Sequence, residues 1–327
     1  MKWGSQRVLV TGATGLIGHH LTRELLSLGS EVAALVPDID PNSEFYRTGI
    51  DRSCTVYSGI LENDDDVRRA LGGFMPDIVF HLGAQTLVGP ALRDPVSTYR
   101  TNVLGTWNLL DACRLITPAA AVVVASSDKA YGETAHLPYL ESLPVQAGAP
   151  YETSKACTDL IAQSYARTYR APIAITRCGN VYGEGDRNWS RLVPGTFKSL
   201  IAGESPVLRS DGTPLRDYIY VADVVNGYLS TAAAITANHD LAGEAFNFST
   251  ETPLSVRSMY GAICEAFGEN VEPLVAGGAS AELQDQYLDA SKARRVLNWS
   301  PEFELADGLD AACLWYSEYF ASPDSIR

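Results

Sequence analysis

Aliphatic and β-branched residues gather in short runs along the first half of the chain, separated by longer segments with apolar residues at three- and four-residue spacing. The runs predict strands over 7–10, 31–36, 54–57, 78–82, 121–125 and 172–176. The spaced segments predict helices over about 16–28, 65–71, 98–116 and 151–169. Strands and helices that alternate in this way build a parallel, doubly wound sheet, so we predict an α/β fold of the Rossmann type.

The pattern changes after Arg177, where connections rich in Gly, Pro and Arg replace the regular alternation. Examples are the stretches 183–186 and 211–214. We therefore predict two domains: a Rossmann domain over 1–180, to which later segments can return, and a smaller C-terminal α/β domain over 181–327.

Composition and charge argue against several classes of protein. The 327 residues are 46% hydrophobic and 20% charged, and no apolar run approaches the roughly 20 residues of a membrane helix. A formal net charge of −14 argues against nucleic-acid binding, which depends on clustered Lys and Arg. The six cysteines include no Cys-x-x-Cys pair, so we expect reduced thiols and no metal site. The first residues are typical of a strand and not of a cleaved leader, and we expect a cytoplasmic protein.

A glycine-rich turn with the sequence TGATGLIG (11–18) follows the first predicted strand and opens the first predicted helix. Glycine permits a tight turn there and a close approach of the backbone to a pyrophosphate, whose charge the helix N-terminus attracts. The turn therefore predicts a dinucleotide site. The expected contacts come from Gly12, Thr14, Gly15, Leu16 and Ile17.

Two groups of residues carry candidate chemistry. Tyr151 and Lys155 lie four residues apart in the predicted helix 151–169, so they share one face and the ammonium can lower the pKa of the phenol. Ser127 follows the strand 121–125, at the edge where ligands bind in open α/β sheets. Asp128 and Lys129 come directly after it, a position that favours catalytic roles. The alternative is a surface ion pair of little energetic weight.

The glycine spacing, Tyr151 and Lys155 together resemble the extended short-chain dehydrogenase/reductases, and among them the NAD-dependent epimerase/dehydratase family. The resemblance implies that Tyr151 exchanges a proton with a carbinol, that Lys155 holds the nicotinamide ribose, and that Ser127 hydrogen-bonds the carbinol oxygen. It also implies further cofactor contacts, from Leu82, Ala84, Gln85 and Asn102.

One position departs from the pattern of this family. The family usually closes the second strand with a carboxylate that holds the cofactor ribose, whereas Val36 occupies that position here. The nearest acid is Asp38, which is either a ribose ligand or a solvated turn residue beside Pro37. Because no Arg lies within 36–42 to receive a 2′-phosphate, we expect NAD and not NADP.

Asp128 and Lys129 decide which reaction the resemblance implies. Sugar-nucleotide 4-epimerases of the family usually carry small, non-acidic residues there, whereas 4,6-dehydratases carry an acid followed by a second proton-transfer residue. The Asp-Lys version is similar to CDP-glucose 4,6-dehydratases. Protonated Asp128 would donate to the departing C6 hydroxyl group, and neutral Lys129 would accept the C5 proton. The alternatives are an epimerase of the same family and a non-catalytic NAD-binding regulator.

The same resemblance implies a nucleotide-sugar site in the second domain. Asn180 lies in the segment CGNVYG (178–183), whose Asn contacts the nucleotide sugar in the family, and Arg216 matches the Arg that clamps the diphosphate. Arg191 and Arg209 are further candidates, with a solvated surface role as the alternative. The helices 98–116 and 151–169 match those that pair across the family's dimer, so we expect a homodimer through a four-helix bundle.

Overall fold

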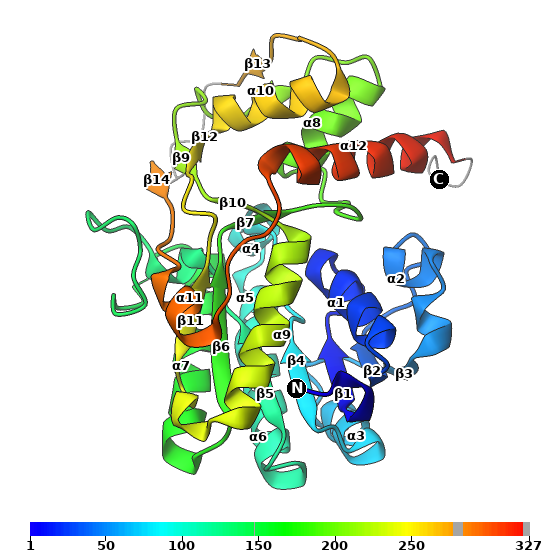
Figure 1. Cartoon of the computed structure of the whole chain (residues 1–327), viewed down its shortest axis with the longest axis vertical. Helices are drawn as coiled ribbons and strands as arrows, with labels where there is room; N and C mark the ends of the chain where they lie inside the picture. The colour runs from blue at the N-terminus through cyan, green and yellow to red at the C-terminus, as the bar shows by residue number, and fades with distance from the viewer. Residues whose placement is uncertain (147, 277–283, 323–327) are drawn as a thin grey trace.

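A seven-stranded sheet forms the centre of the computed structural model, which describes residues 1–146, 148–276 and 284–322. Its order is β11-β6-β5-β4-β1-β2-β3, and each neighbouring pair is parallel. The strands are β1 (Arg7–Thr11), β2 (Glu31–Val36), β3 (Thr55–Ser58), β4 (Ile78–His81), β5 (Ala121–Ala125), β6 (Ile173–Cys178) and β11 (Ala245–Phe248). The predicted doubly wound Rossmann-type fold is confirmed (Figure 1).

Helices cover both faces of this sheet. One face carries α1 (Leu16–Ser27) and α9 (Val221–Ala237), and the other carries α3 (Asp64–Phe74), α6 (Gly105–Ile116) and α7 (Pro150–Tyr169). Alternate residues of β1 supply the two cores: Val8 and Val10 belong to the first, and Leu9 belongs to the second. A sheet buried on both sides needs apolar residues at successive positions, which explains the continuous runs in the sequence.

The predicted helix 98–116 is interrupted. After α4 (Val88–Arg93) and α5 (Pro95–Tyr99) comes a π-helical stretch, Arg100–Leu104, before α6 begins. Asn102 lies in this stretch, where its Nδ2 donates to the carbonyl of Gln85 at 2.9 Å and its Oδ1 accepts from the Gln85 amide at 2.7 Å. A π-helical turn shifts the register of the helix without a compositional signal, so spacing alone did not reveal it.

A second, smaller layer lies beyond the carboxyl edge of the sheet, at the top of Figure 1. Buried aromatic residues, including Phe197, Tyr260 and Tyr316, form its own core. Its elements are α8 (Leu192–Ile201), α10 (Val256–Phe267), α12 (Leu305–Ala321), β8 (Val207–Leu208), β9 (Leu215–Arg216), β12 (Leu254–Ser255), β13 (Leu274–Val275) and β14 (Asp285–Gln286).

The chain passes more than once between the two layers. The short parallel pair β7 (Asn180–Tyr182) and β10 (Tyr218–Tyr220) leads out of the sheet, and then α9 and β11 return to it. Of the predicted second domain, 277–283 and 323–327 lie outside the described residues. Among the helices that the structure describes, none has the length and apolar character of a membrane span.

Candidate active site

A cleft of about 1660 Å³ separates the carboxyl edge of the sheet from the second layer. This volume exceeds the roughly 300–1,000 Å³ of a typical small-ligand pocket, so the cleft has room for two ligands. Both layers contribute to its walls. The glycine turn, residues 125–129 and the start of α7 line one part, and segments 178–182 and 185–196 line another.

The glycine turn forms the cofactor end of the cleft. Gly12 has a φ of +74°, and a Cβ there would lie 2.7 Å from the Gly83 amide nitrogen. A Cβ at Gly18 would lie 2.0 Å from the carbonyl oxygen of Gly12, so turn and helix touch backbone to backbone. Gly15 lines the cleft at the amino end of α1, where its amide donates to the carbonyl oxygen of Gly12 at 3.1 Å. This cradle fits the pyrophosphate of a dinucleotide.

The other predicted cofactor residues divide into three groups. Thr14, Leu16, Ile17, Leu82 and Ala84 line the cleft with the glycines. Gln85 and Asn102 lie behind this wall, paired through the backbone of Gln85. Asp38 is exposed and lies outside the lining, although the neighbouring Pro37 is part of it.

Histidine 81, which adjoins the predicted cofactor segment, is a core residue. His81 is 3% exposed, and its ring nitrogens lie 2.9 Å from the hydroxyl oxygens of Thr11 and Thr106. Burial lowers the pKa of His81 to about 3, with a smaller contribution from the charge of Lys155. The imidazole therefore remains neutral and connects β1, β4 and α6.

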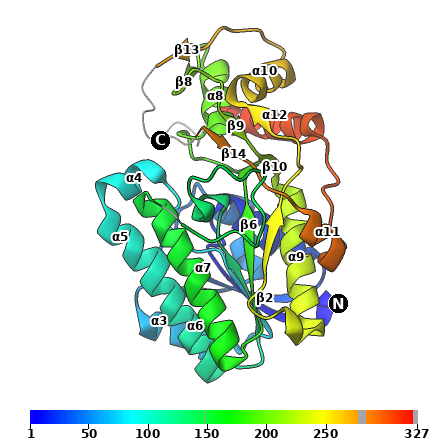
Figure 2. The same cartoon turned by 90° about the vertical axis from the view of Figure 1, so that its left-hand side faces the viewer.

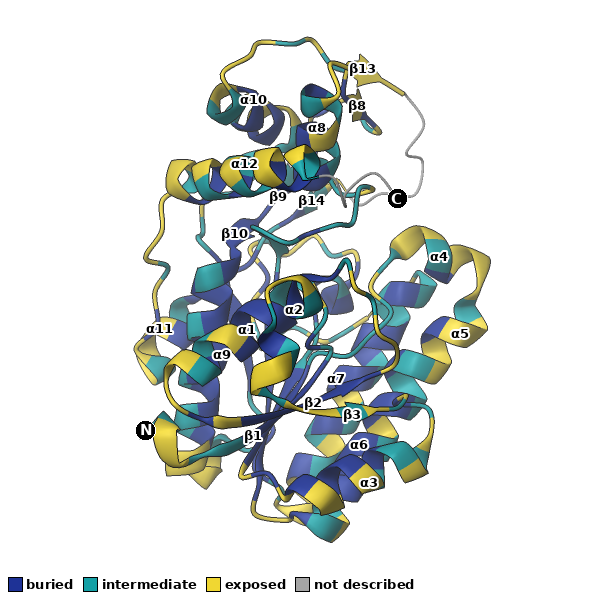
Figure 3. Cartoon of the chain, turned by 90° about the vertical axis from the view of Figure 1, so that its right-hand side faces the viewer, coloured by how far each residue is buried: buried dark blue, intermediate teal, exposed yellow. Residues whose placement is uncertain are grey.

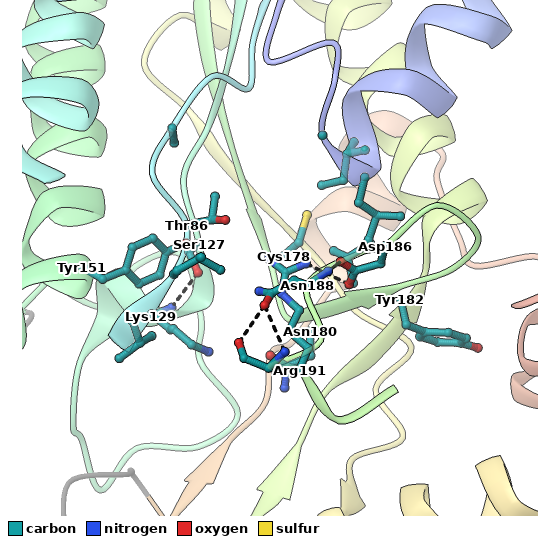
Figure 4. Close-up of a pocket in the computed structure, with 18 of the residues that line it drawn as sticks. Thr86, Ser127, Lys129, Tyr151, Cys178, Asn180, Tyr182, Asp186, Asn188 and Arg191 are labelled. Atoms are coloured by element: carbon teal, nitrogen blue, oxygen red, sulfur yellow. Dashed lines mark hydrogen bonds and ion pairs between the residues drawn. The ribbon is translucent and has the colours of Figure 1, made fainter. Parts of the chain in front are cut away.

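Tyr151 lies in the first turn of α7 and points toward Ser127 (Figure 4). The tyrosine is 8% exposed, and this burial raises the pKa of its phenol to about 12. The charge of Arg191 and the hydroxyl of Ser127 act in the opposite direction. Without a bound cofactor the phenol is therefore protonated at neutral pH.

Lys155 lies one turn further along the same face of α7 and also lines the cleft. Its Nζ donates to the carbonyl oxygen of Ala125 at the end of β5, at 2.8 Å. Burial lowers the pKa of Lys155 to about 8. The predicted juxtaposition of Tyr151 and Lys155 is present in the structure, and both approach the end of β5.

We expect Lys155→Met to stabilise the ligand-free protein at pH 7 by about 1–2 kcal/mol, because the variant removes a buried charge. The Lys155 pKa is lowered in the folded protein, so the folded state binds fewer protons than the unfolded state between about pH 8 and the ordinary lysine pKa. Wild-type stability therefore gains relative to the variant as pH rises through this window.

Urea unfolding of both proteins at pH 7 and pH 10 measures this effect, with Lys2→Met as an exposed control. A Lys155→Met protein that is less stable than wild type at pH 7, or a difference that does not change with pH, would contradict the assignment.

Asp128 and Lys129 open a 3₁₀ turn, Asp128–Tyr131, directly after β5 and Ser127. Ser127 Oγ accepts from the Lys129 amide at 3.2 Å and donates to Asp128 Oδ1 at 2.9 Å. The Lys129 ammonium lies 3.6 Å from the same carboxylate oxygen, and the two side chains are 21% and 2% exposed. This pair is not the surface ion pair considered as the alternative, because the carboxylate is buried at the cleft wall.

The four predicted substrate residues all line the cleft. Arg216 is 4% exposed, and its Nη1 donates to the carbonyl oxygens of Leu215 and Gln284 at 2.8 and 2.9 Å. Arg191 Nη1 lies 3.0 Å from Asp186 Oδ2. Arg209 is exposed and Asn180 is partly buried. Figure 4 shows Asn180 and Arg191 projecting from the segments that face Tyr151.

Several residues of the cleft carried no prediction. Thr86 lines it beside the predicted cofactor segment, and Arg187 lines it while pairing with Asp40. Asp217 lies behind the wall at 1% exposure, and burial raises its pKa to about 7. Its Oδ2 accepts from Ser249 and from the Leu288 amide, residues too distant in sequence for spacing to connect them.

Comparisons of the sequence with a family model and with known proteins indicate the same family. The model of the NAD dependent epimerase/dehydratase family matches residues 8–248. CDP-glucose 4,6-dehydratase of Salmonella typhimurium is 28% identical over an alignment that covers 99% of this chain and 94% of that protein. UDP-glucose 4-epimerase of Mycolicibacterium smegmatis is 31% identical, with 93% and 96% covered.

Solved structures give the same result. A dTDP-glucose 4,6-dehydratase of Streptomyces venezuelae, crystallised with NAD bound, superposes with a TM-score of 0.84 at 28% identity, covering 95% of this chain and 97% of that one. UDP-glucose 4-epimerase of Thermotoga maritima superposes with a TM-score of 0.86 at 26% identity, with 96% and 99% covered. Dehydratases and epimerases are thus both among the similar proteins.

Proposed function

This chain belongs to the NAD-dependent epimerase/dehydratase family, and from that premise we propose that it is an NDP-hexose 4,6-dehydratase with CDP-glucose as the first substrate to test. One observation carries the proposal: a buried carboxylate, Asp128, lies at the cleft wall with the ammonium of Lys129 3.6 Å away. Epimerisation at C4 requires proton exchange at one hydroxyl group. Loss of water requires an acid and a base in addition, and this pair supplies both.

NAD is the cofactor, and when bound it supplies hydride transfer, from C4 of the sugar and later to C6. The residues that fit it are the turn at Gly12 and Gly15, for the pyrophosphate, and Lys155, for the nicotinamide ribose. The sugar nucleotide occupies the second-layer side of the cleft. The Arg216 guanidinium lines the wall there and can add a diphosphate contact to the hydrogen bonds that its Nη1 makes with the Leu215 and Gln284 carbonyls.

Tyr151 acts as the phenolate, which the positive charges of Lys155 and of the oxidised nicotinamide would favour once the cofactor is bound. It begins the reaction by accepting the proton of the C4 hydroxyl group as hydride leaves the same carbon. Ser127 hydrogen-bonds that oxygen and keeps it directed at the phenol. The new ketone acidifies the neighbouring C5 proton, and elimination becomes possible.

Lys129 and Asp128 carry out the elimination. The neutral amine of Lys129 takes the C5 proton, the C6–O bond breaks, and Asp128 gives its proton to the departing hydroxide so that water leaves. Once hydride has reached C6, Lys129 returns its proton to C5 and a 4-keto-6-deoxy sugar results. At the end of the cycle Tyr151 has gained one proton and Asp128 has lost one. Transfer of a proton from Tyr151 to Asp128 through solvent therefore returns the enzyme to its starting state.

The observed ion pair is one proton shift away from the reactive pair. Moving a proton from a lysine ammonium to an aspartate costs about 9 kcal/mol in water. The side chains of Asp128 and Lys129 are 2% and 21% exposed, so the pair is largely shielded from water before a sugar binds. A sugar that fills the cleft removes further water from Lys129, which favours the neutral acid and the neutral base.

The second candidate function is an NDP-sugar 4-epimerase. The 31% identity to the Mycolicibacterium epimerase favours it, and Tyr151, Lys155 and Ser127 suffice for that reaction. It leaves the buried Asp128 and its contact with Lys129 without a role.

Incubation with CDP-glucose, dTDP-glucose and UDP-glucose, followed by mass spectrometry and NMR of the products, tests the proposal. We expect a 4-keto-6-deoxy sugar from one of these nucleotides. A product inverted at C4 with no loss of water indicates the epimerase, and NAD binding without turnover of any sugar indicates a regulator.

We also propose a homodimer through α6 and α7, which lie side by side on one face of the sheet (Figure 2). Large apolar side chains are exposed on this surface and on the adjoining α5, among them Trp107 (55%), Val96 (59%) and Leu160 (53%). Figure 3 shows exposed stretches along α5 and α6. Large exposed apolar side chains on neighbouring helices are typical of an interface.

We expect the wild-type chain, 35.3 kDa, to sediment at twice its mass, and Trp107→Glu to sediment as a monomer. Leu314→Glu, on the 62% exposed position of α12, is the control and should stay dimeric. A monomeric wild type, or a Trp107→Glu dimer of unchanged strength, would refute this interface.

A further inference from the structure

A buried polar network lies behind the cleft, centred on Arg177 of β6. The side chains of Arg177 and Asp159 are 2% and 0% exposed. They form a bidentate pair, with Nε 2.7 Å from Oδ2 and Nη2 2.9 Å from Oδ1. Burial of two charges is costly unless the remaining donors are also satisfied. Arg177 Nη1 accordingly donates to the hydroxyl oxygen of Tyr131, at 2.7 Å.

The network continues from Tyr131 to the edge strand β11. The Tyr131 hydroxyl donates to Asn247 Oδ1 at 2.8 Å, and Asn247 Nδ2 donates to the carbonyl oxygen of Tyr139 at 2.9 Å. Among the described residues that line the cleft, none belongs to the group Arg177, Asp159, Tyr131 and Asn247. These side chains therefore act on the site only through the elements that they join.

The network is connected to the two elements that hold the proposed catalytic residues, helix α7 and the 3₁₀ turn after β5. Asp159 follows Lys155 by four residues and Tyr151 by eight, so all three share one face of α7. Tyr131 ends the 3₁₀ turn that begins at Asp128, and residues three apart in such a turn eclipse one another. The Arg177 guanidinium thus joins the helix that holds Tyr151 to the turn that holds Asp128 and Lys129.

We propose that Arg177, Asp159 and Tyr131 are positioning residues that fix the Asp128–Tyr131 turn relative to α7, so that oxidation at C4 and elimination across C5 and C6 act on one bound pose of the sugar. The inference rests on the proposed dehydratase function. The three carbons are consecutive, and a displacement of about 1 Å in a reacting group can cost about a hundredfold in rate. Oxidation uses groups held by α7 and the end of β5, so a loosened turn impairs elimination and spares oxidation.

Tyr131→Phe removes one hydroxyl group and breaks the link between Arg177 and Asn247. In single turnovers with the NDP-glucose that wild type converts, we expect elimination to slow about tenfold to a hundredfold while formation of bound NADH changes by less than about threefold. The ratio of the two rates is independent of the folded fraction, because both occur on the same bound sugar. We also expect faster amide hydrogen exchange over 128–132 in the ligand-free variant.

Two further variants complete the test. Tyr260→Phe, at a position that is 4% exposed, removes a hydroxyl group that donates to the Val271 carbonyl in the second layer, and it should leave the ratio unchanged. Arg177→Lys keeps the charge but cannot hold Asp159 and Tyr131 together, so it should lower the ratio as Tyr131→Phe does.

The outcomes separate the two proposals. A wild type that forms no 4-keto-6-deoxy sugar overturns the dehydratase function, and this inference with it. A wild type that forms it, while Tyr131→Phe and Arg177→Lys keep the wild-type ratio or slow both steps equally, overturns the positioning role alone.

Discussion

Asp128→Asn is expected to stop dehydration while leaving the first half of the reaction intact. The amide cannot donate an acidic proton to the C6 hydroxyl group, so the rate of 4-keto-6-deoxy sugar formation should fall about 10²–10⁴-fold. Tyr151 and Ser127 still support the oxidation of C4 by NAD, and Lys129 still exchanges the C5 proton. Bound NADH should therefore accumulate, and deuterium from solvent should enter C5 of sugar that retains its C6 oxygen.

Asp211→Asn, an exposed change on the loop before β9, is the matched control and should leave the rate unaltered. Full dehydratase activity in Asp128→Asn would remove Asp128 from the mechanism. Loss of NADH formation together with dehydration would indicate that Asp128 acts in the oxidation and not in the elimination.

Tyr151→Phe is expected to abolish the first step. Without the phenol no group accepts the C4 hydroxyl proton, and bound NADH should form about 10²–10⁴-fold more slowly. Affinity for the nucleotide sugar should change little, because the phenol contributes to proton transfer more than to binding. Stopped-flow absorbance of bound NADH and calorimetric titration measure the two quantities separately.

Tyr182→Phe serves as its control. Tyr182 also lines the cleft, but it points away from Tyr151 (Figure 4) and donates to the Leu305 carbonyl. That variant should form NADH at nearly the wild-type rate. Normal NADH formation by Tyr151→Phe would be fatal to its assignment as the base.

Local signals in the sequence predicted much of the architecture. Each of the six predicted strands is present within two residues of its expected ends, because a strand buried on both faces requires an apolar run. The turn at 11–18 and the pair Tyr151 and Lys155 were recognisable because spacing alone brings their groups together. The family and its NAD cofactor followed from those motifs and are confirmed.

The features that were not predicted depend on contacts between distant residues. β11 pairs with β6 across about seventy residues, and no local pattern identifies that partner. The same holds for Arg177, whose neighbours Asp159 and Tyr131 come from two other elements. The burial of Asp128 could not be predicted from the sequence either, since the residue follows a strand and precedes a polar loop. Of these features, only the burial of Asp128 beside Lys129 carries the proposal of dehydration.

The most direct measurement is the fate of deuterium placed at C4 of the NDP-glucose that the enzyme converts, with CDP-glucose tried first. We predict that this deuterium moves to C6, giving a 4-keto-6-deoxy sugar with a CH₂D group and the loss of one water. Deuterium that remains at C4 of a sugar inverted at that carbon, with the C6 hydroxyl group intact, would contradict the dehydratase and establish the epimerase.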